Sequence, residues 1–111
     1  MVANNADRKS GHCLIDRESG LWLIDHGLTF HTEFKLRTVI WDYAGREIPV
    51  KLGEDLARAA TEIDGALGAE LAELISRSEL RLLQRRLAAA AKPGFQLPQP
   101  RSAWSVPWPP V

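Results

Sequence analysis

The sequence of 111 residues predicts a single α+β domain that is mostly helical. Three observations lead to this class: two short apolar runs around a turn, apolar residues at helical spacing in the second half, and an end rich in proline and tryptophan. A chain of this length holds one domain at most. We therefore expect 1–52 to form a hairpin with its loops, 53–93 to form helices, and 94–111 to form an extended tail.

The apolar runs at 13–15 and 21–24 lie on either side of a polar, glycine-containing turn. Short apolar runs in this arrangement predict a β-hairpin, with Trp22 as a core residue. Residues 37–43 are interpreted as a short helix that ends at Ala44-Gly45 and is followed by a break at Pro49. Trp41, in that segment, is also expected in the core.

Helical spacing begins after Gly53 and predicts two helices. The apolar face of the first contains Leu56, Ala59, Ala60, Ile63 and Leu67, is interrupted at Gly68, and resumes with Leu71, Leu74 and Ile75. Ser76 and Glu79 form a capping box for a second helix over 77–91, and Lys92-Pro93-Gly94 ends it. Its apolar stripe is Leu80, Leu83 and Leu87, and Arg85-Arg86 is expected to be a solvated face.

Six of the seven prolines lie from Pro93 onward, together with two of the four tryptophans. Proline at this density excludes regular helix and central strand. The apolar residues Trp104, Val106 and Trp108 are too many for a typical disordered segment. We therefore expect an extended tail that packs on the rest of the chain.

Composition excludes several classes of function. The 14 basic and 14 acidic residues cancel, so net charge predicts no attraction to nucleic acid or to an anionic membrane. Cys13 is the single cysteine, which leaves no intrachain disulfide and fits a reducing, cytoplasmic setting. The N-terminus does not resemble a signal peptide, and no apolar run is long enough to cross a bilayer.

The residues that indicate chemistry are Asp7, His12, Asp25 and Gly27. Protein kinases have a catalytic Asp in a loop, a metal-binding Asn five residues later, then a hairpin, then a metal-binding Asp with Gly two positions on. The four residues occupy these positions in order, with His12 in place of Asn. Neutral imidazole suits manganese or zinc better than magnesium. The spacing of His12, His26, His31 and Cys13 fits no common zinc site.

Longer motifs extend this pattern. The chain contains Asn4-Asn5-Ala6-Asp7-Arg8-Lys9, Gly11-His12, Asp25-His26-Gly27, Phe30-His31, Lys35-Leu36-Arg37-Thr38-Val39 and Pro107-Trp108-Pro109-Pro110. In these motifs it resembles a bacterial, mostly actinobacterial, family described as phosphatidylinositol 3-/4-kinase-like. The resemblance covers nearly the whole chain. It implies the C-terminal half of a kinase catalytic domain, that is, a kinase-like C-lobe.

The resemblance also implies roles. Asp7 would orient the attacking hydroxyl with Arg8 beside it, Asp25 and His12 would hold the metal, and Asn5, Lys9 and His12 would contact the nucleotide. The implied cofactors are ATP with Mg²⁺ or Mn²⁺, and the acceptor is a hydroxyl on a lipid, a protein or a small molecule. Lys35 and Arg37 lie where an anionic substrate would approach, although exposed solvated charges explain them equally well. His26 is expected to pack or hydrogen-bond behind the metal loop.

One part of the kinase pattern is missing. The sequence has no Gly-rich nucleotide loop, no phosphate-pairing strand lysine and no helix glutamate. We therefore expect the chain alone to be incomplete and to offer an exposed face where the other lobe would bind. Two alternatives remain open at this stage: a non-catalytic, truncated remnant, and an interaction module that uses the exposed lobe face to bind a partner.

Overall fold

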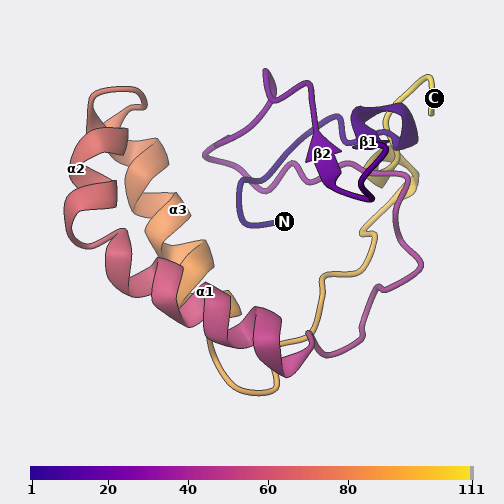
Figure 1. Cartoon of the computed structure of the whole chain (residues 1–111). Coiled ribbons are helices and arrows are strands. Elements are labelled where there is room, and N and C mark those ends of the chain that lie inside the picture. Colours follow the sequence, from indigo (N-terminus) through magenta and orange to yellow (C-terminus); the bar gives the residue numbers. More distant parts are fainter. Residues whose placement is uncertain (111) are drawn as a thin grey trace.

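The computed structural model describes residues 1–110 and has the predicted α+β composition. In chain order it has a 3-10 turn η1 (Ser10–His12), strands β1 (Cys13–Ile15) and β2 (Leu21–Leu23), helices α1 (Val50–Glu62), α2 (Ala66–Ala72) and α3 (Arg77–Ala90), and a 3-10 turn η2 (Ala103–Ser105). The helices lie on one side of the molecule, the hairpin and the C-terminal end lie on the other, and the N-terminus lies between them (Figure 1).

The predicted hairpin is present. Strands β1 and β2 pair antiparallel, with Cys13 opposite Leu23 and Ile15 opposite Leu21. Asp16 closes the turn because its carboxylate accepts hydrogen bonds from the amides of Glu18 and Gly20 and from the Trp22 indole. These hydrogen bonds lower the pKa of Asp16, and the one from Trp22 has the largest effect. Trp22 is 61% exposed, so the expectation that it is a core residue was wrong.

The short helix expected over 37–43 is absent, and a turn occupies 42–45. The backbone of this segment bonds to distant partners instead of to itself. The carbonyl of Arg37 accepts from the amide of Arg8, the amide of Val39 donates to the carbonyl of Arg8, and the amide of Thr38 donates to Ser105. β-Branched residues at 38–40 favour such an extended path.

The core lies between α1 and α3. Ile63, Leu83 and Leu87 are buried together, and Leu56, Ala59, Ala60, Leu71, Ile75 and Leu80 pack around them. Most of the predicted apolar faces therefore meet. Leu67 and Leu74 do not belong to this core, since both are exposed.

Helix boundaries differ from the expectation at two glycines. α1 begins at Val50, directly after Pro49, whereas spacing had placed its start after Gly53. The break comes at 63–65, and Gly68 lies inside α2. A Cβ at Gly68 would lie 2.0 Å from the Ile63 carbonyl oxygen. Gly68 thus permits close packing of α2 on the end of α1 and does not interrupt the helix.

The capping box of α3 is confirmed. The Glu79 amide donates to Ser76 Oγ at 3.2 Å, and the Ser76 amide donates to the Glu79 carboxylate at 2.7 Å. α3 runs over Arg77–Ala90, one residue shorter than predicted. Arg86 is not on a solvated face: its guanidinium donates to the carbonyls of Val2 and His31 and so ties α3 to the N-terminal loop.

The tail packs on the body, but not through its tryptophans. Leu97 exchanges backbone hydrogen bonds with Gly45 and Arg46, and Ser105 accepts from Thr38 and from the Trp41 indole. Ser105 and Pro107 are buried, whereas Trp104 and Trp108 are 79% and 89% exposed. None of the helices in 1–110 combines the length and apolarity that crossing a bilayer requires.

Candidate functional site

Two adjacent asparagines fix the loop that leads to Asp7. Asn4 is 1% exposed and takes a left-handed backbone conformation (φ 50°). Its amide nitrogen donates to the carbonyls of His31 and Glu33, and its oxygen accepts from the Lys35 amide. Asparagine is one of the few residues that adopts this backbone region readily. Asn4 therefore fastens the first loop to residues 31–35.

Asn5 shapes the turn that presents Asp7. Its side-chain oxygen accepts from the Asp7 amide at 2.7 Å, and its carbonyl accepts from the Arg37 amide. Asn5 is 5% exposed, and its Nδ2 has no hydrogen-bond partner. A buried donor without a partner costs roughly 1–3 kcal/mol. Asn5 was predicted to contact the nucleotide, but in this structure its Nδ2 is closed off from solvent.

Arg8 links the loop to the end of the hairpin. Its guanidinium donates to the carbonyls of His12 (3.2 Å) and Ile24 (2.7 Å) and lies 3.2 Å from His26 Nδ1. Through these contacts, Arg8 positions the backbone at His12 and at Ile24, on the two sides of the site. The resemblance placed Arg8 beside Asp7, but the side chain that pairs with the Asp7 carboxylate is Lys9, at 3.3 Å.

His26 lies behind the loop, as expected. Its Nε2 is 2.9 Å from the Leu23 carbonyl, which can only accept, so Nε2 carries the proton. Nδ1 is then the acceptor for Arg8. His26 and Arg8 together hold the residues on either side of Asp25.

Asp7, His12 and Asp25 come together at the mouth of the hairpin. One ligand atom from each side chain lies within 4.8 Å of the other two. His12 Nε2 is 3.4 Å from Asp25 Oδ2, and Lys9 Nζ is 3.3 Å from Asp7 Oδ1. Of the two carboxylates, Asp25 is the more exposed. These are the three residues that the kinase spacing singled out, and the structure brings them together.

The sharp turn after β2 occurs at Asp25 itself. Asp25 has φ 57°, in the left-handed region, whereas Gly27 does not have positive φ. A non-glycine residue held in this region is uncommon and costs of order 1 kcal/mol, and such residues concentrate at functional sites. The turn directs the Asp25 carboxylate toward His12.

The donor set fits a divalent cation. Two carboxylates and one imidazole suit Zn²⁺, which needs about one further ligand, or Mn²⁺ and Mg²⁺, which each need about three more, mostly oxygen. A metal bound at about 2.1 Å separates its ligand atoms by roughly 3.0 Å at right angles and 4.2 Å when opposite. The 3.4 Å between His12 and Asp25 is close to the first value, and the 4.8 Å limit exceeds the second by little.

The His12 ring must change tautomer to bind a metal. Its Nδ1 faces the Lys9 amide at 3.5 Å, which puts the proton of the neutral ring on Nε2, toward Asp25. Coordination through Nε2 requires the other tautomer and gives up this long, weak bond. Without a metal, His12 Nε2 and Asp25 Oδ2 lie 3.4 Å apart as a close polar contact that is not a hydrogen bond.

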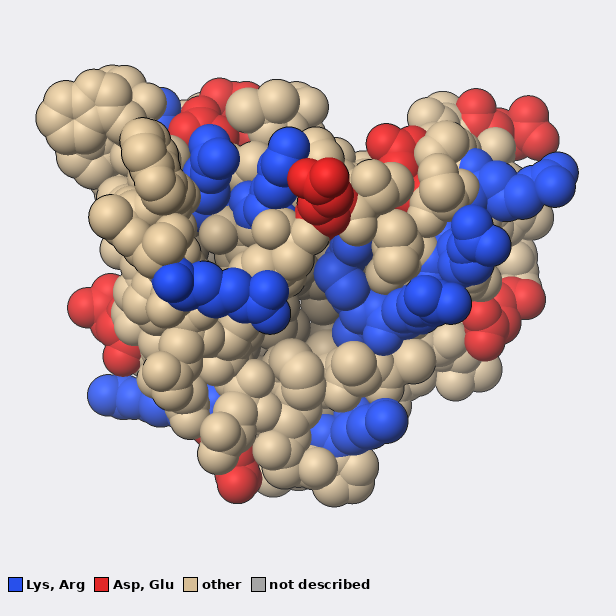
Figure 2. All heavy atoms as spheres, turned by 180° about the vertical axis from the view of Figure 1, so that it is seen from behind, with Lys and Arg blue, Asp and Glu red and all other residues tan. Residues whose placement is uncertain are grey.

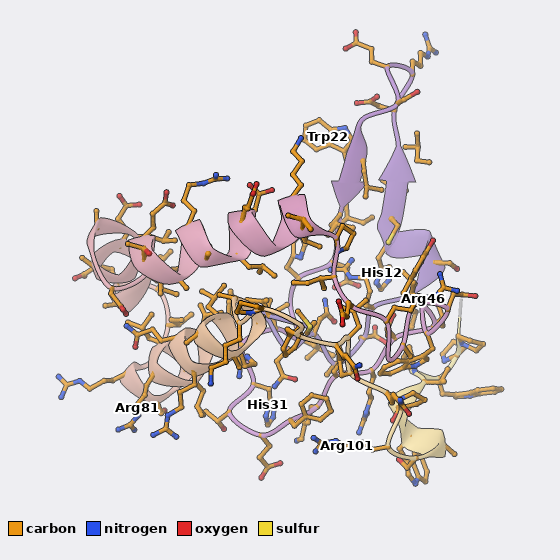
Figure 3. All side chains as sticks on the ribbon, turned by 90° about the horizontal axis from the view of Figure 1, so that it is seen from below. His12, Trp22, His31, Arg46, Arg81 and Arg101 are labelled. Atoms are coloured by element: carbon orange, nitrogen blue, oxygen red, sulfur yellow. The ribbon has the colours of Figure 1, made fainter. Side chains whose placement is uncertain are left out.

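Apolar surface lies next to this cluster. The hairpin exposes Leu14, Ile15, Leu21, Trp22, Leu23 and Ile24. Figure 3 shows the hairpin projecting from the body, with His12 near its base and Trp22 along it. Large exposed apolar patches on a monomer mark interaction sites. The sequence predicted an exposed face where another lobe would bind, and for this apolar surface such a partner stays a prediction.

Comparison with known proteins gives one relative. Protein Rv2133c of Mycobacterium tuberculosis is 37% identical to the chain over 109 residues. The match covers 98% of the chain but only 39% of the relative, so the chain spans about two fifths of that protein's length. No protein-family model matches the chain, and no solved structure matches it significantly.

Sequence reasoning missed Asn4 and Arg86. Both act through contacts to residues 27 or more positions away, which local spacing does not reveal. A signal for Asn4 did exist, since an Asn-Asn pair in a loop often marks left-handed backbone. Arg86 gave none, because it lies next to the exposed Arg85 in the same basic pair.

Proposed function

We propose that the chain is the kinase-like C-lobe of a phosphotransferase of the phosphatidylinositol 3-/4-kinase-like class, which transfers the ATP γ-phosphate to a hydroxyl. The observation that carries this proposal is the meeting of Asp7, His12 and Asp25 within 4.8 Å. These are the three residues that kinase spacing singled out, and they come from a loop and from the far end of a hairpin.

Asp7 is the residue that orients the acceptor hydroxyl. Its carboxylate is partly exposed and is paired with Lys9 at 3.3 Å. Lys9 neutralises Asp7, so a metal would be held mainly by the other two side chains. An ammonium at this position also stabilises the negative charge of a transferring phosphoryl group. Arg8 acts through the backbone of His12 and Ile24 as a positioning residue.

Asp25 and His12 are the proposed metal ligands, for Mg²⁺ or Mn²⁺. A metal held there would supply positive charge that offsets the negative charge of the ATP phosphates. Asp25 supplies a carboxylate exposed enough to meet a nucleotide. The residues that would hold the rest of ATP are proposed to lie in sequence beyond these 111 residues, in keeping with the greater length of the relative.

Metal binding by the chain tests the site directly. Electron paramagnetic resonance of Mn²⁺ should show loss of the free-ion signal on titration with the protein. Asp25→Asn should weaken binding roughly tenfold or more, since it removes a charged ligand. Asparagine also tolerates the left-handed backbone at this position. Asp42→Asn is the matched control, because Asp42 is an exposed carboxylate in the 42–45 turn. Equal weakening by both variants would exclude a specific site.

Phosphoryl transfer tests the proposed reaction. The 111 residues alone should turn over no ATP, because positioning groups for the nucleotide are missing. A longer polypeptide that supplies the second lobe should transfer radiolabelled phosphate, and Asp25→Asn should abolish this activity. A rate that stays within a few-fold after Asp25→Asn would remove Asp25 from the mechanism.

An interaction module is the second candidate function. The exposed apolar face of the hairpin favours it, since Ile15 and Leu21 are 75% and 68% exposed. In that case the hairpin would bind another polypeptide without catalysis. Ile15→Ser and Leu21→Ser should then abolish association while Asp25→Asn changes nothing. A longer polypeptide without phosphoryl transfer, but with association that depends on the hairpin, would favour this function.

A further inference from the structure

The face opposite to that of Figure 1 carries an uneven distribution of charge. Figure 2 shows Lys and Arg side chains across the middle of this face, with most acidic side chains toward its edge. Between residues 34–37 and the tail lies a recess of about 140 Å³. Among the residues that line it are Phe34, Lys35, Arg37, Arg101, Ser102 and Trp104, and no carboxylate is among them.

The cations of this recess have few anionic partners. Arg37 and Arg101 form no salt bridge within 1–110, and Lys35 pairs only loosely with Glu33, at 3.6 Å. Three cations around one small recess repel one another unless an anion joins them. The chain as a whole has zero net charge, so an excess of basic residues in its composition does not account for this cluster of three cations.

The walls of the recess are held in place. The Arg101 guanidinium lies over the Phe34 ring, 4.1 Å from its centroid, which fixes its plane. The Arg101 and Ser102 amides donate to the oxygen Oγ of buried Ser105, whose carbonyl accepts from Thr38. The Arg37 amide donates to Asn5. Both sides are therefore tied to one framework before any ligand arrives, which lowers the cost of binding.

We propose that this recess binds a phosphate group carried by a ligand. Guanidinium groups recognise phosphate through paired, charge-assisted hydrogen bonds, and two of the three cations are arginines. The volume suits one phosphate group, since pockets for drug-sized molecules are roughly 300–1,000 Å³. The exposed Trp104 at the rim offers an apolar face to the part of the ligand that bears the phosphate. Phosphate binding in this recess does not depend on the proposed phosphoryl transfer at Asp7.

Nuclear magnetic resonance of the 111-residue protein tests the proposal. Inorganic phosphate and glycerol 3-phosphate should shift the Trp104 indole and Arg101 amide signals, and sodium chloride at equal ionic strength should not. Arg101→Gln and Arg37→Gln should each weaken phosphate binding roughly tenfold or more. Arg101→Lys keeps the positive charge but loses the planar guanidinium, so its phosphate affinity should lie between those of the wild type and Arg101→Gln.

Arg81→Gln is the matched control. Arg81 is an exposed arginine of α3 without a salt bridge in the described residues, and it lies well away from Arg101 (Figure 3). If Arg81→Gln weakens phosphate binding as much as Arg101→Gln does, the effect is general electrostatics and the proposal fails. Indistinguishable shifts with phosphate and chloride would also overturn it.

Vesicles identify the source of the phosphate. Phosphatidylcholine vesicles with phosphatidic acid, compared with phosphatidylcholine alone, are assayed by co-sedimentation. Binding of the soluble probes without sedimentation supports a free phosphorylated molecule. Sedimentation with phosphatidic acid that Arg101→Gln reduces, and Arg81→Gln does not, supports a lipid headgroup. Absence of both kinds of binding overturns the recess as a phosphate site.

Discussion

Asn4 holds the loop of the candidate site through three hydrogen bonds to residues 31–35. The residues with chemical potential, Asp7, His12 and Asp25, could be found from their spacing and type alone. Asn4 could not be assigned this role, because its partners are about thirty positions away in the chain. The same limit explains Arg8, whose type suggested a partner in the adjacent Asp7 but whose actual partners are backbone carbonyls at 12 and 24.

Asn4→Ala should destabilise the protein by roughly 2–4 kcal/mol, because buried amide and carbonyl groups lose their partners. Chemical denaturation monitored by circular dichroism measures this loss. Asn4→Gly is the companion variant, since glycine tolerates φ 50° and so separates the backbone effect from the hydrogen bonds. A loss below about 0.5 kcal/mol for Asn4→Ala would contradict the role given to Asn4.

For the helices, sequence spacing predicted which segments are helical and which of their faces point inward. It was less accurate on the residues at which each helix begins and ends. The capping box located the start of α3 correctly, because Ser76 and Glu79 act within one turn. Gly68 was misjudged, because its reason lies in packing on the Ile63 carbonyl and not in helix propensity. The expected helix at 37–43 failed for a similar reason, since its backbone pairs with the loop at Arg8 and with the tail.

Gly68→Ala and Gly53→Ala form a matched pair within helices. Alanine favours a helix over glycine by up to about 1 kcal/mol. At Gly53 the new Cβ has its nearest atom at 3.9 Å, so Gly53→Ala should stabilise the protein. At Gly68 the carbonyl at 2.0 Å must move, and Gly68→Ala should cost roughly 2 kcal/mol or more. Equal effects of the two variants in thermal unfolding would contradict this packing.

The capping box also predicts a pH effect. Hydrogen bonds from Ser76 lower the pKa of Glu79 below its ordinary 4.5. A lowered folded-state pKa contributes stability that is present above the unfolded-state pKa and is lost as pH falls through the folded-state value. Glu79→Gln keeps a hydrogen-bonding side chain but cannot titrate. The stability difference between wild type and Glu79→Gln should therefore shrink on acidification below about pH 4.5, as measured by urea unfolding across pH. A difference that stays constant from neutral to acid pH would exclude this linkage.

At the scale of the whole molecule, three distant segments form one body. The N-terminal loop, the 37–48 segment and the tail exchange backbone hydrogen bonds, and Arg86 connects the loop to α3. Sequence reasoning expected a packed tail because of its apolar residues, and the tail does pack. Its attachment comes instead from backbone groups near Leu97 and Ser105, which no side-chain pattern reports. The tryptophans remain on the surface, where Trp104 borders the phosphate recess.

Removal of the tail and removal of its tryptophans should therefore have different effects. Truncation after Pro93 leaves Gly45, Ile48 and Thr38 without their hydrogen-bond partners and should lower the melting temperature by roughly 10 °C or more. Trp104→Ala and Trp108→Ala remove exposed side chains and should each change it by less than about 3 °C. Differential scanning calorimetry of the three variants decides the point. If either tryptophan variant loses as much as the truncation does, the tail is attached through its aromatic side chains. An unchanged melting temperature for the truncated protein would mean that the tail contributes nothing to the fold.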